Sequence, residues 1–278
     1  MSHPALQKGL RDSCLGLNVP MAERFRLAHL GGFEGIELSL PIEGPFSLQA
    51  SDRELAEIEA LAADNMPVLC MNAGSNWEVP VSAADPATRR RGLDLVRRSI
   101  EIAQRLRVDT LLYIPGSVTP DHDFASVWDA ARTATEELLP AAEQAGVTLA
   151  VENVWNKLIL SPRDMVEFVD EFDSPHLRVY FDVGNVLAFG YPQHWIRALG
   201  PRIARVHVKD FHTDPGGRAG FTQLLHGEVD WPATLTALQA VGYRGWVTPE
   251  VLPYLHFHES WLHELSGAMD VIMSYYPV

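Results

Sequence analysis

The most informative stretch of the sequence is Leu177-Arg178-Val179-Tyr180-Phe181-Asp182-Val183-Gly184-Asn185. It begins as a run of mostly apolar and β-branched residues, which is typical of a buried strand. Asp182 follows this run directly, and a carboxylate at the end of a buried strand is costly to desolvate unless a positive group meets it. The stretch therefore predicts a strand that ends in a functional side chain.

Three further apolar runs end in the same way. They are Val147–Val151, followed by Glu152, Ile203–Val206, followed by His207, and Gly245–Pro249, followed by Glu250. Carboxylates and imidazoles are common metal ligands in proteins. The four strand ends therefore predict a metal site made of Glu152, Asp182, His207 and Glu250, and the rest of the chain is expected to be the scaffold that brings them together.

Apolar strands and amphipathic helices alternate eight times along the chain. The predicted strands are 14–18, 33–38, 67–72, 110–114, 147–152, 177–182, 203–207 and 245–250. The predicted helices are 21–30, 51–61, 85–103, 123–145, 161–172, 195–199, 230–240 and 259–272. Helix boundaries are marked by a Ser51–Glu54 capping box, by Asp85-Pro86 and by Gly146 as a C-cap. The arginines of helix 85–103 are expected to form a solvated outer face rather than a phosphate site.

Eight βα units predict an α/β protein with a closed (β/α)8 TIM barrel that occupies residues 1–278 as a single domain. An open, doubly wound parallel sheet is the alternative. The length of 278 residues suits a barrel, and 47% hydrophobic residues can supply its core. In such barrels the catalytic residues come from the C-terminal ends of several strands, which is where all four predicted ligands lie.

The chain is acidic, with 36 Asp and Glu against 22 Lys and Arg and a formal net charge of −14. This charge argues against nucleic acid and against an anionic membrane surface as partners, because both require clustered Lys and Arg. The sequence has neither a spanning apolar run nor the apolar core of a signal peptide. We therefore expect a soluble, cytoplasmic protein with a small-molecule partner, with homo-oligomerisation left open. Cys14 and Cys70 lie in apolar runs and are expected to be buried thiols.

The spacing and chemistry of the predicted ligands suit one divalent cation. Separations of 30 and 25 residues between the first three ligands suit one βα unit each, and a Gly-rich insertion at 214–220 lengthens the interval before Glu250 to 43 residues. Three carboxylates and one imidazole form a mostly hard ligand set, which favours Mn²⁺, Mg²⁺ or Co²⁺ over a structural Zn²⁺. We expect Mn²⁺ as the cofactor, with Mg²⁺, Co²⁺ or Zn²⁺ as alternatives.

Five stretches carry a resemblance to a known family. They are Val151-Glu152-Asn153, Phe181-Asp182-Val183-Gly184-Asn185, Val206-His207-Val208-Lys209-Asp210, Gly227-Glu228-Val229-Asp230-Trp231 and Pro249-Glu250. On these stretches the chain resembles the xylose-isomerase-like barrels, the sugar isomerase and epimerase superfamily that also includes endonuclease IV. The match covers essentially the whole chain, most firmly residues 146–252. Its Asp-x-Gly-Asn and His-x-Lys-Asp forms are most similar to ketose and ketose-phosphate 3-epimerases.

The resemblance implies an isomerase with one divalent cation held by Glu152, Asp182, His207 and Glu250. It also implies that the metal chelates a ketose carbonyl and a neighbouring hydroxyl, and stabilises an enediolate as a Lewis acid. Glu152 and Glu250 are then also the catalytic acid and base. One removes the C3 proton, and the other returns a proton on the opposite face.

Five further residues are candidate substrate contacts. Lys209 is two residues after His207, so the two side chains share one face of the strand. Asn185 follows Asp182 by three residues, at a position where some relatives carry His. Arg218 lies in the Gly-rich insertion and can meet a distal hydroxyl or a phosphate. Trp155 and His226 are expected to line the pocket that binds the sugar.

The sequence departs from the family pattern at one place, which leaves other activities open. Free-ketose epimerases often carry a further acidic residue soon after the first metal glutamate, where this chain has Asn156, Lys157 and Leu158. The alternatives are a keto-polyol (inosose-type) dehydratase and a sugar-binding relative without catalytic activity. Endonuclease IV-type cleavage needs more metals, more His ligands and a basic face, which the net charge disfavours.

Overall fold

The eight long strands form a closed barrel with the order β1-β10-β7-β6-β5-β4-β3-β2. The computed structural model describes residues 5–16, 19–44, 46–63, 66–72, 77–254 and 256–277. The chain forms two compact units, Met1–Leu38, Leu61–Leu69 and Tyr180–Val278 in the first, and Ser39–Ala60 and Cys70–Val179 in the second. The predicted (β/α)8 barrel is confirmed, and the alternative of an open sheet is wrong.

The described elements follow the predicted alternation of strands and helices. The strands of the barrel are β1 (Leu6–Arg11), β2 (Gly35–Ser39), β3 (Val68–Asn72), β4 (Thr110–Tyr113), β5 (Thr148–Glu152), β6 (Leu177–Asp182), β7 (Ile203–Val208) and β10 (Gly245–Pro249). The α-helices are α1 (Met21–Leu30), α2 (Asp52–Ala63), α3 (Pro86–Arg105), α4 (Phe124–Ala145), α5 (Pro162–Asp170), α6 (Val183–Val186), α7 (Pro192–Leu199), α8 (Trp231–Ala240) and α9 (His258–Met273).

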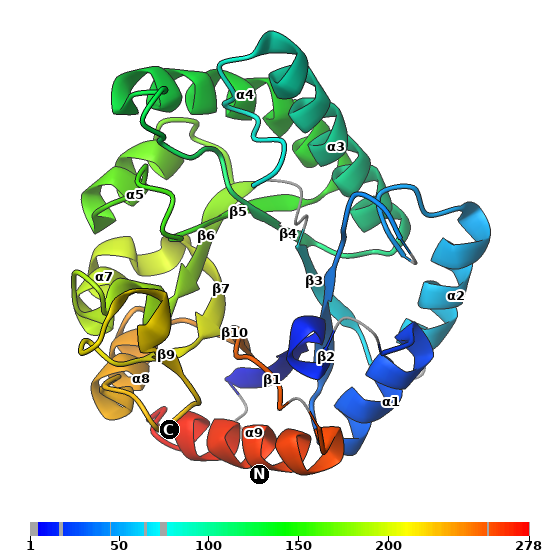
Figure 1. The fold of residues 1–278 in the computed structure, drawn as a ribbon, viewed down its shortest axis with the longest axis vertical. Helices are drawn as coiled ribbons and strands as arrows, with labels where there is room; N and C mark the ends of the chain where they lie inside the picture. Colours follow the sequence, from blue (N-terminus) through cyan, green and yellow to red (C-terminus); the bar gives the residue numbers. More distant parts are fainter. Residues whose placement is uncertain are drawn as a thin grey trace. The chain divides into compact units, whose positions relative to one another are not determined.

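In the first unit, parallel pairing joins strands from the two ends of the chain. β1 pairs with β10 on one side and with β2 on the other, and β10 also pairs with β7. Helix α9 runs alongside β1, and α7 and α8 lie side by side (Figure 1). The Lys8 ammonium of β1 binds Asp270 of α9 at 2.6 Å, which ties the last helix to the first strand. The C-terminal ends of β1, β2, β6, β7 and β10 therefore lie close to one another.

The prediction of a first strand at 14–18 is wrong. The strand is β1 (Leu6–Arg11), and Asp12–Leu15 form a 3-10 helix, while residues 17 and 18 lie outside the described residues. Polar side chains interrupt β1, so it lacks the apolar run that indicates a buried strand. Lys8 is nevertheless buried through its aliphatic stem, because its ammonium group has partners on α9.

In the second unit, β4 pairs in parallel with β3 and β5, and helices α3 and α4 lie side by side (Figure 1). Their predicted caps are confirmed. The Asp85 side chain accepts a hydrogen bond from the backbone N–H of Thr88 at 2.8 Å, and Gly146 ends α4 with a left-handed φ of 69°. The Ser51–Glu54 capping box at the start of α2 is also present.

The arginines of α3 face solvent and pair with acidic side chains, as predicted. Their partners include Asp94 and Glu101 on the same helix and Glu137 on α4. The apolar face of α3 is buried, with Leu93, Val96, Ile100 and Ala103 in the core. Both cysteines are buried and neither forms a disulfide, and burial raises the pKa of the Cys14 thiol to about 12.

A small hairpin that the sequence did not indicate flanks the Gly-rich insertion at 214–220. Strands β8 (Asp210–Phe211) and β9 (Phe221–Thr222) pair antiparallel. The buried Asp210 carboxylate accepts hydrogen bonds from the backbone N–H groups of Phe211 and Val229, at 3.0 and 3.2 Å. These bonds connect the start of the hairpin to the segment before α8, and the pairing of β8 with β9 holds the loop that carries Arg218 next to the end of β7.

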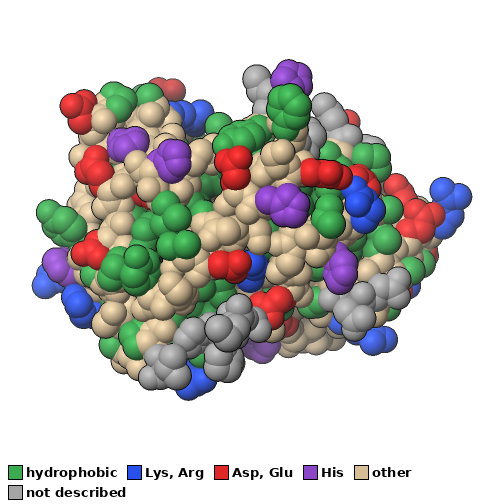
Figure 2. Space-filling model, turned by 90° about the horizontal axis from the view of Figure 1, so that it is seen from below, with side chains coloured by type: hydrophobic (Ala, Val, Ile, Leu, Met, Phe, Trp, Pro, Cys, Tyr) green, Lys and Arg blue, Asp and Glu red, His purple; other side chains and the backbone are tan. Residues whose placement is uncertain are grey.

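Figure 2 shows basic, acidic and apolar side chains mixed on one face, where the described Lys and Arg residues are scattered. Among the described helices, none has the length and apolar character that crossing a membrane requires.

Candidate metal centre

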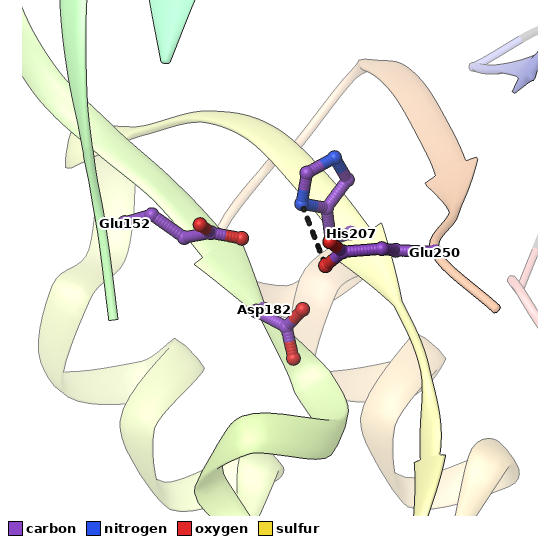
Figure 3. Close-up of side chains that lie close together, drawn as sticks. All are labelled: Glu152, Asp182, His207 and Glu250. Atoms are coloured by element: carbon purple, nitrogen blue, oxygen red, sulfur yellow. Dashed lines mark ion pairs between the residues drawn. The ribbon is translucent and has the colours of Figure 1, made fainter. Parts of the chain in front are cut away.

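The four predicted ligands come together. Glu152, Asp182, His207 and Glu250 each offer one ligand atom, and these atoms all lie within 4.8 Å of one another (Figure 3). Asp182 is the last residue of β6, His207 lies next to the end of β7, and Glu250 directly follows β10. His207 and Asp182 are fully buried, and the side chain of Glu250 is 25% exposed. Parallel strands therefore bring ligands from distant parts of the sequence to one place.

Asp182 has a structural task in addition to its place among the ligands. Its Oδ1 accepts a hydrogen bond from the backbone N–H of Asn185 at 2.7 Å, which caps helix α6. Its Oδ2 lies 3.2 Å from the ammonium group of Lys209. The capping bond uses one oxygen and fixes the rotamer, so the other oxygen points to the other ligands.

Two cationic side chains contact Glu250, one at each carboxylate oxygen. The Arg11 guanidinium forms an ion pair with Oε1, and the Lys209 ammonium lies 2.6 Å from Oε2. The Nδ1 atom of His207 lies 3.8 Å from the same Oε2 (Figure 3). Glu250 is thus held in a single orientation, with one oxygen facing His207 and Lys209.

Glu37 and Arg11 belong to this centre, and the sequence analysis did not identify them. Glu37 is fully buried in the middle of β2, where its Oε2 lies 3.0 Å from His207 Nε2 and accepts a 2.5 Å hydrogen bond from the Tyr180 hydroxyl. The guanidinium of Arg11 lies 3.7 Å from Glu37. One signal was present, because Glu37 is a charged residue between Ile36 and Leu38 in a run that otherwise reads as a buried strand.

The environment of Glu37 favours its ionised form. Complete burial by itself would raise the pKa of this carboxyl, but the hydrogen bond from His207, the charge of Arg11 and the Tyr180 hydroxyl outweigh it and lower the pKa. Glu37 is therefore a fixed negative charge next to the Nε2 atom of His207.

The donor set fits a divalent cation. Glu37, Glu152, Asp182 and Glu250 supply four carboxylates, and Arg11 and Lys209 supply two positive charges, all from described residues. Two negative charges therefore remain, which one divalent cation neutralises. Carboxylate oxygens with a single imidazole nitrogen also match the ligands that Mn²⁺ and Mg²⁺ prefer.

Three of the predicted substrate contacts lie next to this centre. A cavity of about 540 Å³ is lined by Glu250, Lys209 and Arg218, together with Phe221 and other residues of the insertion. Asn185 is buried, and its Oδ1 lies 3.4 Å from the Lys209 ammonium. The cavity thus opens directly beside one predicted metal ligand and contains two cationic groups.

The other two predicted contacts are placed differently. His226 is exposed and lines a second cavity of about 290 Å³, together with Tyr254 and residues of α9. Trp155 is half-buried, three residues after the end of β5. Asn156, the first residue of the 156–158 stretch noted above, is buried and accepts hydrogen bonds from the backbone N–H groups of Leu158 and Ile159.

We expect Gly184→Ala to lower the free energy of unfolding by about 1–3 kcal/mol. A Cβ at this position in α6 would lie 2.7 Å from both the Cβ and the carbonyl oxygen of Lys209, so the helix and the residue that follows β7 would have to separate. Urea unfolding measures the effect. Gly267→Ala on α9 is the matched control, because a Cβ there meets nothing within 4 Å and should raise stability by about 0.5–1 kcal/mol. Equal stability of Gly184→Ala and the wild type would contradict the close approach.

Comparison with known proteins finds relatives among sugar epimerases. The chain is 28% identical over 244 residues to the L-ribulose-5-phosphate 3-epimerase UlaE of Salmonella paratyphi A, which covers 85% of this chain and 84% of the relative. A solved L-ribulose 3-epimerase matches with a TM-score of 0.81 at 18% identity, over 98% of this chain and 95% of that chain. D-psicose 3-epimerase with D-tagatose, from Clostridium cellulolyticum H10, matches with a TM-score of 0.78 at 18% identity, over 98% and 100%.

These two structures support the barrel fold, and a family model supports the relationship in sequence. The model of the xylose isomerase-like TIM barrel matches residues 25–266, which include all four predicted ligands. The chain belongs to the xylose isomerase-like TIM-barrel family.

Proposed function

We propose that this protein is a divalent-metal-dependent sugar or sugar-phosphate epimerase or isomerase that acts on a ketose. The observation that carries the proposal is the cluster of Glu152, Asp182, His207 and Glu250, with the cavity that opens beside Glu250. The two negative charges left by the surrounding side chains suit a divalent cation. The similarity to L-ribulose-5-phosphate 3-epimerases supports the choice of substrate class.

Glu152 and Glu250 perform the proton transfers in this proposal. One carboxylate accepts the C3 proton as the C3–H bond breaks, and the other, protonated, delivers a proton to the opposite face of C3 as the new bond forms. Each glutamate returns to its starting form by exchange with solvent. A bound divalent cation supplies the Lewis-acid polarisation of the carbonyl that makes the C3 proton acidic.

The neighbouring cations orient the reacting groups and the substrate. Arg11 and Lys209 hold both oxygens of Glu250. The carboxylate is therefore already oriented before the reaction, which lowers the entropic cost of the proton transfer. Arg218, at the cavity wall, is placed for a distal hydroxyl or a phosphate of the sugar. A volume of about 540 Å³ suits a five- or six-carbon sugar with or without a phosphate.

A deuterium-exchange assay tests the proposed function. A panel of ketoses and ketose phosphates is incubated in D₂O with protein stripped of metal by EDTA and with the same protein reloaded with Mn²⁺. We expect deuterium at C3 of at least one ketose, with formation of its epimer, only in the reloaded sample. Exchange without epimer but with loss of water identifies the dehydratase instead. Binding of a sugar without exchange at any carbon identifies a relative without catalytic activity.

A further inference from the structure

We propose that Glu37 is a positioning residue that, together with Tyr180, fixes the tautomer and orientation of His207 so that Nδ1 is presented to the metal ion. The inference rests on the proposed metal-dependent function. It assigns a role to Glu37 and Tyr180, which are buried and are not among the four predicted ligands. Every contact on which it rests lies within the first compact unit.

The contact between Glu37 and His207 decides the tautomer. Glu37 Oε2 lies 3.0 Å from His207 Nε2, and both side chains are completely buried. An ionised carboxylate only accepts hydrogen bonds, so Nε2 must carry the proton and donate it. The opposite ring nitrogen, Nδ1, then has a lone pair in the neutral ring. This is the nitrogen that faces the Glu250 carboxylate, at 3.8 Å from Oε2.

Tyr180 completes the support from the next strand. Its hydroxyl donates a 2.5 Å hydrogen bond to the same Glu37 oxygen, and its ring lies against the imidazole with centroids 4.1 Å apart. The carboxylate oxygen thus accepts one bond from each side chain, and the ring contact limits rotation of His207. Side chains from two strands, Glu37 of β2 and Tyr180 of β6, therefore hold the imidazole that β7 carries.

The distances also argue against the alternative that Glu37 serves mainly as an ion-pair partner of Arg11. The Arg11 guanidinium is 3.7 Å from Glu37, which is beyond hydrogen-bond distance, whereas it forms a direct ion pair with Glu250. The close partners of Glu37 are thus Tyr180 and His207. Carboxylates that accept a hydrogen bond from the distal nitrogen of a metal-binding histidine raise the basicity of the ligand, and their loss lowers metal affinity by about 10–100-fold.

Glu37→Gln tests the charge while preserving the shape of the side chain. We expect the dissociation constant for Mn²⁺, measured by competition with a fluorescent chelator, to rise about 10–100-fold. Tyr180→Phe, which removes one hydrogen bond and keeps the ring contact, should give a smaller rise in the same direction. Tyr113→Phe is the matched control, because it removes a buried hydroxyl that bonds to Thr135 in the second unit and should leave Mn²⁺ affinity unchanged.

The tautomer of His207 is a second readout. It would not change if Glu37 only stabilised the fold. Long-range ¹H–¹⁵N NMR spectra of the metal-free protein, with the His207 signals assigned by their absence in His207→Asn, report which ring nitrogen is protonated. We expect a protonated Nε2 in the wild type and a mixture of tautomers in Glu37→Leu. Wild-type protein that binds no Mn²⁺ would refute the proposed function. Wild-type protein that binds Mn²⁺ with an affinity and a tautomer unaffected by both Glu37 variants would refute the role of Glu37 alone.

Discussion

Mn²⁺ is expected to raise the melting temperature of the wild-type protein and to leave that of His207→Ala unchanged. At a free concentration of 100 times its dissociation constant, an ion that binds only the folded state stabilises it by about 2.7 kcal/mol. For a chain of 278 residues this corresponds to an increase of about 5 °C. His207 supplies the only imidazole of the predicted ligand set, so its loss should abolish both the thermal shift and catalytic turnover.

The imidazole of His207 is buried, so a second variant is needed in case His207→Ala folds poorly. Asp182→Asn suits this purpose because an asparagine oxygen can still accept the capping hydrogen bond of α6. It should fold normally and lose most of the Mn²⁺-dependent shift, as scanning calorimetry with and without the ion would show. A full thermal shift in both variants would show that the ion binds elsewhere.

The predicted metal ligands could be identified because each is a polar side chain that directly follows an apolar run in the sequence. Asp182, His207 and Glu250 each follow an apolar run, and the parallel order of a barrel places such ends together. The prediction required no knowledge of side-chain conformations. For the same reason the insertion at 214–220 was located correctly, since it lengthens one interval between ligands, whereas its hairpin was not foreseen.

The support around the ligands could not be predicted in this way. Arg11 was missed because β1 contains Gln7 and Lys8 within a short run, and Lys8 becomes compatible with burial only once α9 provides Asp270. Glu37 was missed because its role depends on side-chain contacts with Tyr180 of β6 and His207 of β7, which are not neighbours of β2 in the barrel. Local patterns identify side chains that end strands, but they do not reveal which buried charges pair across distant strands.

The largest effect on catalysis is expected from replacing either of the two proposed catalytic glutamates by glutamine. Glu152→Gln and Glu250→Gln keep the size of the side chain and one oxygen for the metal, but a neutral amide cannot accept the C3 proton. We expect each variant to lose at least about 100-fold in turnover of the substrate ketose, which is the usual contribution of a general acid or base. The loss of Mn²⁺ affinity should be much smaller. Glu101→Gln, on the exposed side of α3, is the control and should be fully active.

Exchange of the C3 proton in D₂O distinguishes the two glutamates. For a given epimer, the variant that lacks the base cannot remove the proton, whereas the variant that lacks only the returning acid can still remove it and exchange it with solvent. With the other epimer the two variants should change places, because the faces of C3 are reversed. Equal exchange by both variants with either epimer, or turnover near that of the wild type, would exclude the two-base mechanism. Equal exchange by both variants would favour a one-base isomerisation, whereas turnover without exchange would favour a hydride shift, which moves hydrogen within the sugar.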